Sequence, residues 1–269
     1  MQSISIIGCG WLGLPLGQYL AEKGFPVKGS TTQKEKLTTL AAAQIEPFHL
    51  QVTADGIVGQ ELADFWNSDI LLINLPPGRR NPNVLVDHPK QIEHILAANH
   101  SKYILYTSST GVYSDEKPLA QENDALSPTR NSTKAIAQIE QQLQQLTDIK
   151  VIILRLAGLV GGDRQAGRFF AGKTDITDPE KPVNVVHQED IIQIIHQIIV
   201  REEWNDVFNV CADEHPTKRE FYTQQARKLN LTPPEFQDAN LSKPFKIVDN
   251  TKIKTALNYQ FLHPDPIQF

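Results

Sequence analysis

Three glycines, Gly8, Gly10 and Gly13, follow the short apolar run of residues 4–7 at the start of the chain. In a G-x-G-x-x-G pattern after a strand, the first glycine permits a tight turn and the second lets the backbone approach a pyrophosphate. The third lets the next helix pack closely on the sheet, and that helix would point its N–H groups and positive dipole end at the phosphates. The spacing therefore predicts a dinucleotide-binding turn; the alternative is a purely structural glycine turn.

The end of the second expected strand carries no acidic residue. In dinucleotide-binding units, an Asp or Glu about 20 residues beyond the glycines contacts the ribose 2′-hydroxyl of NAD. Here the sequence reads Ser30-Thr31-Thr32-Gln33-Lys34, and a second lysine, Lys36, lies two positions beyond Lys34. Hydroxyl groups and lysines suit a 2′-phosphate, so we expect NADP to be preferred over NAD. The alternative is that both lysines are ordinary solvated helix residues.

The elements that would position this turn alternate along the chain. Short apolar runs predict strands at residues 4–7, 27–30, 70–75, 103–108, 151–156 and 207–210. Helices are expected at residues 11–23, 128–146, 189–200 and 217–229. This alternation is typical of an α/β fold with a doubly wound parallel Rossmann sheet. We expect residues 1–160 to form the NAD(P)-binding Rossmann domain and residues 161–269 a small C-terminal substrate lobe, with part of 183–212 returning to the main sheet.

The helix expected at residues 128–146 has two faces of different character. Ser127 is its predicted N-cap, and Pro128 falls in its first turn. One stripe is apolar and should pack on the sheet. The opposite face could meet solvent or a partner, because it is rich in glutamine: Gln138, Gln141, Gln142, Gln144 and Gln145.

Four further segments are expected near the carboxyl ends of the strands, where an open α/β sheet binds its ligands. They start at Asn74, Ser108, Arg130 and Arg155 and read NLPPGRR, SSTGVY, RNSTK and RLAGLVG. With the later VNVVHQED, FNV and KIKTALNY, they make nearly the whole chain resemble the extended and atypical short-chain dehydrogenase/reductase superfamily. The resemblance is greatest to its NAD(P)-dependent nucleotide-sugar epimerase/dehydratase-like branch.

The resemblance implies roles for four residues. In that superfamily, the serine four positions before the tyrosine of the SSTGVY-like segment holds the substrate oxygen, which assigns Ser109 this role. The family's Y-x-x-x-K pair is replaced by Arg130-x-x-x-Lys134, so Lys134 could hold the nicotinamide ribose while the proton-transfer tyrosine is absent. Arg130 stays protonated and cannot be an ordinary base; it could clamp a substrate phosphate or carboxylate, or be an exposed residue at the helix start. Tyr113 could substitute as acid/base or only pack.

The same edge supplies the expected cofactor contacts. Ala157 and Gly158 fall where the family passes backbone beside the nicotinamide, and small residues suit that approach. Arg79 and Arg80 are candidates for a phosphate, or simply solvated loop charges. The expected cofactor-binding set is Gly8, Gly10, Trp11, Leu12, Gly13, Ser30, Thr31, Thr32, Lys34, Asn74, Leu75, Pro76, Pro77, Lys134, Ala157 and Gly158.

Composition excludes several classes of function. The net charge of −5 and the pI of about 5.9, with no basic stripe, argue against nucleic acid and anionic membranes as partners. No apolar run approaches the roughly 20 residues of a membrane span, so a cytoplasmic protein is expected. Cys9 and Cys211 form no disulfide framework and fall in segments expected to be buried. The histidines show no metal-ligand spacing, so no metal is expected.

Two functions of different class follow. The first is an NAD(P)-dependent oxidoreductase or epimerase/dehydratase-like enzyme, a monomer or homodimer, acting on a nucleotide sugar or another small carbonyl or alcohol. The second is a non-catalytic NADP-binding sensor that signals through the glutamine-rich face. Loss of the tyrosine favours the sensor, whereas the presence of Ser109 together with Lys134 favours the enzyme.

Overall fold

The computed structural model describes residues 1–60, 62–76, 78, 81–238 and 244–269. Their helices and strands gather into two compact units, each built from several stretches of chain. The first unit comprises Met1–Val112, Pro128–Leu154 and Ile198–Val207, and the second comprises Tyr113–Ser127, Arg155–Gln197 and Phe208–Phe269.

Within the described residues, one sheet holds eight strands in the order β11-β8-β6-β5-β1-β2-β3-β4. In chain order these are β1 (Ile4–Ile7), β2 (Val27–Thr31), β3 (Glu46–Thr53), β4 (Gly56–Gly59), β5 (Ile70–Ile73), β6 (Tyr103–Ser109), β8 (Lys150–Leu156) and β11 (Asp206–Val210). β1 lies between β2 and β5 and is parallel to both. The chain therefore winds outward from β1 on one side and returns to β5 on the other, which confirms the predicted doubly wound Rossmann-type α/β fold.

The register of these strands brings their carboxyl ends together. Ile7 at the end of β1 pairs with Ile73 at the end of β5, and Ile73 pairs with Tyr106 of β6. All four residues of β1 and of β5 are buried, as expected for strands covered on both faces. The loops that follow β1, β5 and β6 consequently leave the sheet at the same edge.

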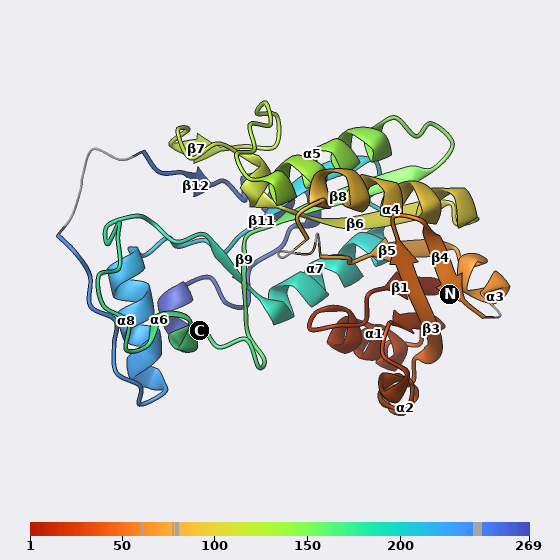
Figure 1. Cartoon of the computed structure of the whole chain (residues 1–269), viewed down its shortest axis with the longest axis horizontal. Coiled ribbons are helices and arrows are strands. Elements are labelled where there is room, and N and C mark those ends of the chain that lie inside the picture. Colours follow the sequence, from red (N-terminus) through yellow and green to blue (C-terminus); the bar gives the residue numbers. More distant parts are fainter. Residues whose placement is uncertain (61, 77, 79–80, 239–243) are drawn as a thin grey trace. The chain divides into compact units, whose positions relative to one another are not determined.

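The helices of the first unit cover both faces of its sheet. They are α1 (Gly13–Glu22), η1 (Lys34–Lys36), α2 (Leu37–Ala42), α3 (Ala63–Trp66), α4 (Val84–Ala98), η2 (Thr110–Val112) and α5 (Asn131–Gln144). Figure 1 shows α4 and α5 side by side on one face and α1 and α2 on the other. Of the apolar stripe predicted for this helix, Ile136, Ile139 and Leu143 are at most 5% exposed, whereas Leu146 lies beyond the end of α5 and is half-buried.

The second unit has smaller sheets and its own core. Its elements are β7 (Leu119–Ala120), β9 (Gly158–Val160), α6 (Gly167–Phe170), β10 (Val185–His187), the first part of α7 (Gln188–Arg201), α8 (Lys218–Lys228), β12 (Ile247–Val248), α9 (Thr251–Leu257) and η3 (Pro266–Gln268). β9 pairs with β10 and β7 with β12, both in parallel. Val160 of β9, Val185 of β10 and Phe221 of α8 belong to one buried apolar cluster.

Two sequence expectations are wrong in detail. Ser127 does not cap the helix predicted from residue 128, because Arg130 is still extended (φ −88°, ψ 148°) and occupies the N-cap position, so α5 begins at Asn131. The β3–β4 hairpin was not expected at all. β3 pairs in parallel with β2 and antiparallel with β4, which places β4 at the margin of the sheet.

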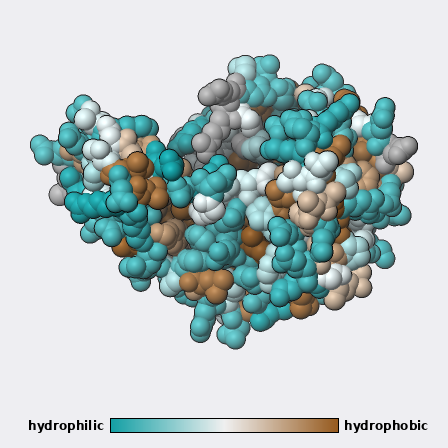
Figure 2. Space-filling view, turned by 90° about the horizontal axis from the view of Figure 1, so that it is seen from below, coloured by the Kyte–Doolittle hydropathy of each residue, from teal (hydrophilic) through white to brown (hydrophobic). Residues whose placement is uncertain are grey.

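The surface is largely polar. Figure 2 shows hydrophilic side chains over most of the visible face, with apolar side chains in small separate groups. Among the helices of the described ranges, none has both the length and the apolar character that crossing a bilayer requires.

Candidate functional site

The glycine turn leads from β1 into α1 and is held by its neighbours. Gly8 has a positive φ of 95°, and a Cβ on it would lie 2.4 Å from the carbonyl oxygen of Asn74. A Cβ on Gly13 would lie 2.3 Å from the carbonyl oxygen of Gly8. Both positions therefore need glycine for the fold itself.

Gly10 differs from the other two glycines. Apart from its two chain neighbours, no heavy atom of the described residues lies within 4 Å of a Cβ built on Gly10, so a side chain there would intrude on the space of a ligand and not on these residues. The open space in front of Gly10 is what close approach of a ligand requires. The helix after it begins without any side-chain cap, which leaves its N-terminus suited to an anion.

Residues at the end of β2 contact the glycine turn through a hydrogen bond. The Ser30 hydroxyl, 2% exposed, accepts a hydrogen bond from the Gly8 N–H at 3.1 Å. The Thr31 hydroxyl accepts from the Gln33 N–H, while Thr32 and Lys34 are exposed at the start of η1. Cys9 packs beside Gly29, and burial raises the pKa of its thiol to about 12. This supports a filling role for Cys9 over a nucleophilic one.

Asn74 connects the glycine turn to β6. Its amide Nδ2 donates to the Gly8 carbonyl oxygen at 3.0 Å, and its Oδ1 accepts from the Thr107 hydroxyl at 3.1 Å. Leu75 lies beside the turn, and Pro76 is exposed. Pro77, an expected cofactor contact, lies outside the described residues, as do Arg79 and Arg80, the candidates for a phosphate or for solvated loop charges.

The two serines at the end of β6 point in different directions. Ser108 is buried and its hydroxyl donates to the carboxyl group of Glu140, which is fully buried on α5. Ser109 is half-buried, and its Oγ accepts from the Gly111 N–H at 3.1 Å. Accepting this bond leaves the hydroxyl proton of Ser109 able to donate to a ligand. Of the two serines, Ser109 is thus the one placed to contact a substrate.

The start of α5 packs against the turn that follows Ser109. A Cβ on Gly111 would lie 2.8 Å from Thr133 Cγ2, so the two segments are in direct contact. Lys134, the next residue, is exposed, and its N–H closes the first helical turn onto the Arg130 carbonyl oxygen. Arg130 is also exposed. Lys134 and Arg130 therefore lie one helical turn apart near the end of β6.

In the second unit, Tyr113 is held inside a polar network. Its phenol accepts from Arg155 Nη1 at 2.6 Å and donates to Asn209 Oδ1 at 2.7 Å, and the residue is 4% exposed. Burial raises the pKa of the Tyr113 phenol to about 12, against the opposing effect of Arg155. This geometry supports the packing alternative for Tyr113 over the acid/base alternative.

We expect Tyr113→Phe to lower the free energy of unfolding by about 1–3 kcal/mol, because Arg155 and Asn209 lose a buried hydrogen-bond partner. Urea denaturation measures this. Tyr106→Phe is the matched control: the Tyr106 hydroxyl is fully buried with no hydrogen-bond partner in the described residues, so its loss should not destabilise. A Tyr113→Phe protein of wild-type stability that loses 10²–10⁴-fold in turnover would instead make Tyr113 the acid/base.

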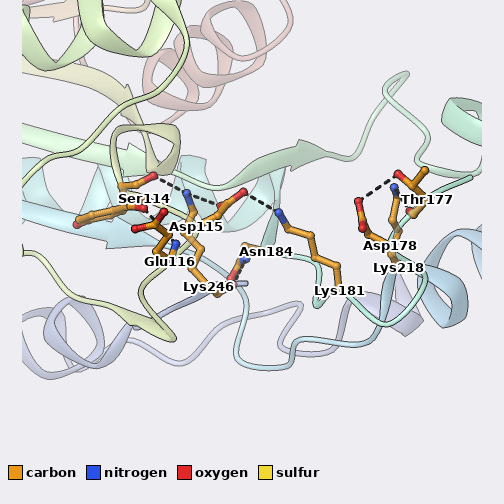
Figure 3. A network of polar contacts seen from close by, with 10 residues as sticks. Ser114, Asp115, Glu116, Thr177, Asp178, Lys181, Asn184, Lys218 and Lys246 are labelled. Carbon is orange, nitrogen blue, oxygen red and sulfur yellow. Dashed lines mark hydrogen bonds and ion pairs between the residues drawn. The ribbon is translucent and has the colours of Figure 1, made fainter. Parts of the chain in front are cut away.

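The segment after Tyr113 is fastened by a second polar network (Figure 3). The Asp115 carboxylate accepts from Lys181 at 2.7 Å and pairs with Lys246 at 3.2 Å. Burial alone would raise the pKa of Asp115, but the two lysines outweigh it and hold that pKa below its usual value. Lys246 also donates to the Tyr113 carbonyl oxygen at 2.8 Å. The backbone beyond the Ser109 segment is thus fixed by paired charges.

Ala157 and Gly158 are positioned by backbone pairing in the second unit. The Ala157 N–H donates to the Val210 carbonyl oxygen, and the Gly158 N–H to that of Asn184. A Cβ on Gly158 would lie 3.0 Å from the Asn184 oxygen, so β9 needs a small residue there for its pairing with β10. Contact of either residue with a cofactor remains a prediction.

Two structural residues of the site had no role in the sequence expectations. Asn209 is fully buried and connects Tyr113 to the backbone of Ala120 and Asp249. Glu122 accepts from the Asn209 N–H. The FNV segment carried a signal for Asn209, since a polar residue between apolar neighbours in a strand needs a partner inside the protein.

Comparison with known proteins places this chain among others of the same fold. No protein-family model matches it. Protein YeeZ of Escherichia coli K12 is 35% identical over 270 residues, which cover 99% of this chain and 98% of YeeZ. A short-chain dehydrogenase/reductase superfamily protein from Agrobacterium tumefaciens, solved with bound NAD, matches with a TM-score of 0.78 at 16% identity, over 96% of this chain and 92% of that one.

A second solved structure is UDP-glucose 4-epimerase from Thermotoga maritima with UDP-glucose. It matches with a TM-score of 0.77 at 15% identity, over 97% of this chain and 94% of that one. These structures share the fold predicted from the sequence segments. The chain belongs to the same family as YeeZ, within the short-chain dehydrogenase/reductase fold of the NAD-dependent epimerases and dehydratases.

Proposed function

We propose that this chain is an NAD(P)-dependent oxidoreductase or epimerase/dehydratase-like enzyme that acts on a nucleotide sugar or another small carbonyl or alcohol. The observation that carries the proposal is the arrangement at the carboxyl edge of the sheet. The glycine turn with its open space at Gly10 follows β1, and the half-buried Ser109 ends β6, two strands away. Open α/β sheets bind ligands at this edge, beside the strand where the winding reverses.

The chain's residues would divide the work as follows. A bound dinucleotide supplies hydride acceptance and donation at its nicotinamide. The glycine turn and the uncapped start of α1 would hold the pyrophosphate, and Asn74 keeps that turn in place. Ser109 would donate its hydroxyl proton in a hydrogen bond to the substrate oxygen, and Lys134 would hold the ribose.

When a hydride is removed from a substrate alcohol, the hydroxyl proton must also be accepted by some group. This chain lacks the tyrosine that accepts it in the family, so another acceptor is needed. Arg130 stands in that position and remains protonated. Tyr113 is engaged with Arg155 and Asn209. We therefore assign proton exchange to water or to a group of the substrate, with Arg130 available to pair with a substrate phosphate or carboxylate.

The enzyme proposal is tested by following the absorbance of bound cofactor. Purified protein loaded with oxidised or reduced cofactor is mixed with a panel of nucleotide sugars and small carbonyl compounds. Oxidation or reduction of the cofactor by one of them supports the enzyme. Tight dinucleotide binding without turnover on the whole panel would reject it in favour of the second candidate.

That second candidate is a non-catalytic NADP sensor. It is favoured by the replacement of the proton-transfer tyrosine by Arg130. It is also favoured by the glutamine-rich face of α5, which is largely exposed. Among the described contacts of these glutamines, one side-chain hydrogen bond reaches α4, from Gln142 to Glu93. A sensor would bind the dinucleotide as tightly as the enzyme does but would bind a partner in a cofactor-dependent way.

We further propose that NADP is preferred over NAD, because Lys34 is exposed after the hydroxyls that end β2 and residues 30–34 include no acid. Lys34→Ala should weaken NADP binding by about 1–3 kcal/mol, the worth of one charge-assisted hydrogen bond, and leave NAD binding unchanged. Calorimetric titration of both cofactors measures the ratio. Lys90→Ala, on the exposed surface of α4, is the control. Equal affinities in the wild type, or a ratio that Lys34→Ala does not move, would count against the preference.

A further inference from the structure

Three potential metal ligands meet in the second unit, away from the residues assigned above. They are His187 at the end of β10, Glu189 in the first turn of α7, and His263 in the C-terminal segment. One ligand atom from each lies within 4.8 Å of the other two. His263 Nε2 is 2.8 Å from a carboxylate oxygen of Glu189, and the two imidazole rings lie 3.8 Å apart between centroids.

A fully buried carboxylate holds the C-terminal segment in this position. Asp190 Oδ1 accepts from the Leu262 N–H and the Tyr259 hydroxyl, both at 2.7 Å, and its Oδ2 accepts from the His263 N–H at 3.1 Å. Asp190 directly follows Glu189 in the chain. The same short segment therefore supplies one ligand and fixes the backbone of another.

The packing around the histidines further restricts their rings. His187 Nε2 would lie only 2.8 Å from a Cβ on Gly161, so that glycine makes room for the imidazole. The Phe269 ring stands edge-on to both imidazoles, at 5.4 and 6.1 Å between centroids. Preformed and partly dry surroundings reduce the reorganisation that metal binding would cost.

The donor types also suit a metal. Two imidazoles and a carboxylate form a donor set that zinc sites use, with a fourth position left for water.

We propose that His187, Glu189 and His263 bind a zinc ion. Ligand atoms of a tetrahedral zinc lie about 3.3 Å apart, so the three ligand atoms, now up to 4.8 Å apart, must close by about 1.5 Å at most. Two imidazoles on one such ion have ring centroids about 5 Å apart, so the rings of His187 and His263, now 3.8 Å apart, must also open by about 1 Å, while the exposed Glu189 side chain can follow the ion. The ion would tie the C-terminal segment to the junction of β10 and α7. Its role would be structural, because it would hold His263 and the C-terminal segment against the start of α7.

The experiment titrates ZnCl₂ into the full-length protein after chelator treatment and dialysis, using isothermal titration calorimetry. We expect one zinc per chain and a zinc-dependent rise in Tm. His263→Gln and Glu189→Gln should each weaken binding at least tenfold and reduce the Tm shift. Glu189 is exposed, so Glu189→Gln tests the site even if the histidine variant fails to fold.

His100→Gln is the matched control, because His100 is an exposed histidine outside the cluster. It should bind zinc like the wild type, and Co²⁺ should give the intense visible absorption of a tetrahedral site in both. Absence of stoichiometric zinc binding, or equal binding by the wild type and Glu189→Gln, would overturn the proposal. The readouts require neither dinucleotide nor turnover, so they are independent of the enzyme proposal.

Discussion

The Gly10→Val variant is expected to fold like the wild type and to lose dinucleotide binding, with an affinity at least a hundredfold weaker. Apart from its two chain neighbours, no atom of the described residues lies within 4 Å of a Cβ at Gly10, so the added side chain should cost the fold little. The same side chain would occupy the space through which a pyrophosphate reaches the backbone and the start of α1. Calorimetry with NAD and NADP measures the loss, and thermal unfolding measures the stability.

Gly13→Ala provides the contrast. Its Cβ would lie 2.3 Å from the Gly8 carbonyl oxygen, so the helix must shift, and overpacking of this kind costs about 1–3 kcal/mol. The two glycines thus separate ligand binding from folding. Unchanged dinucleotide affinity in Gly10→Val would reject the glycine turn as the binding site, whatever its effect on stability.

Most of the central sheet was predictable because its strands are short continuous apolar runs. β1 and β5, which read ISII and ILLI, are buried on both faces and stand out from the surrounding sequence. β3 was missed because Glu46, His49 and Gln51 interrupt its apolar residues and only Leu50 is buried. A strand that is half-exposed near a sheet edge resembles a loop in composition.

The meeting of the candidate site residues at one edge of the sheet was predictable where it depends on parallel strands. β1 is followed by Gly8, β5 is followed by Asn74, and β6 ends at Ser109. Because these neighbouring strands are parallel, their carboxyl ends lie at one edge of the sheet, independently of the conformation of the loops. The partners of Tyr113 were not predictable, because Arg155 and Asn209 lie 42 and 96 positions away in the chain. The same holds for the His263 and Glu189 pair, 74 positions apart.

Arg130 stands where the family has the tyrosine of its Y-x-x-x-K pair, and the geometry around Arg130 indicates what this replacement changes. The helix begins later than its sequence pattern suggests, so Arg130 flanks α5 and is exposed, while Lys134 keeps its place one turn later. An arginine there can add a positive charge for a substrate phosphate but cannot exchange protons. In the enzyme proposal, the Ser109 hydroxyl is the group that would meet the reacting oxygen, which makes Ser109 the decisive residue for that proposal.

We expect Ser109→Ala to lower kcat by about 10²–10³-fold and to leave dinucleotide affinity unchanged. The half-buried hydroxyl is oriented by the Gly111 N–H, so a preorganised donor to the reacting oxygen would be lost. In the described residues, the hydrogen bonds that hold Gly8 come from Ser30 and Asn74 and not from Ser109, so the glycine turn should keep its shape in this variant. Steady-state turnover on the best substrate of the panel, together with calorimetry on the cofactor, measures both quantities.

Ser108→Ala is the matched control, because the two serines are chain neighbours but Ser108 is buried against Glu140 while Ser109 is half-buried. The Ser108 hydroxyl donates to the buried Glu140, so its loss should cost about 1–3 kcal/mol of stability and change turnover little at temperatures where the variant is folded. Full activity in Ser109→Ala would remove Ser109 from the mechanism. Loss of activity in Ser108→Ala at unchanged stability would transfer its role to the neighbouring serine, since the end of β6 would then present Ser108 and not Ser109 to the substrate.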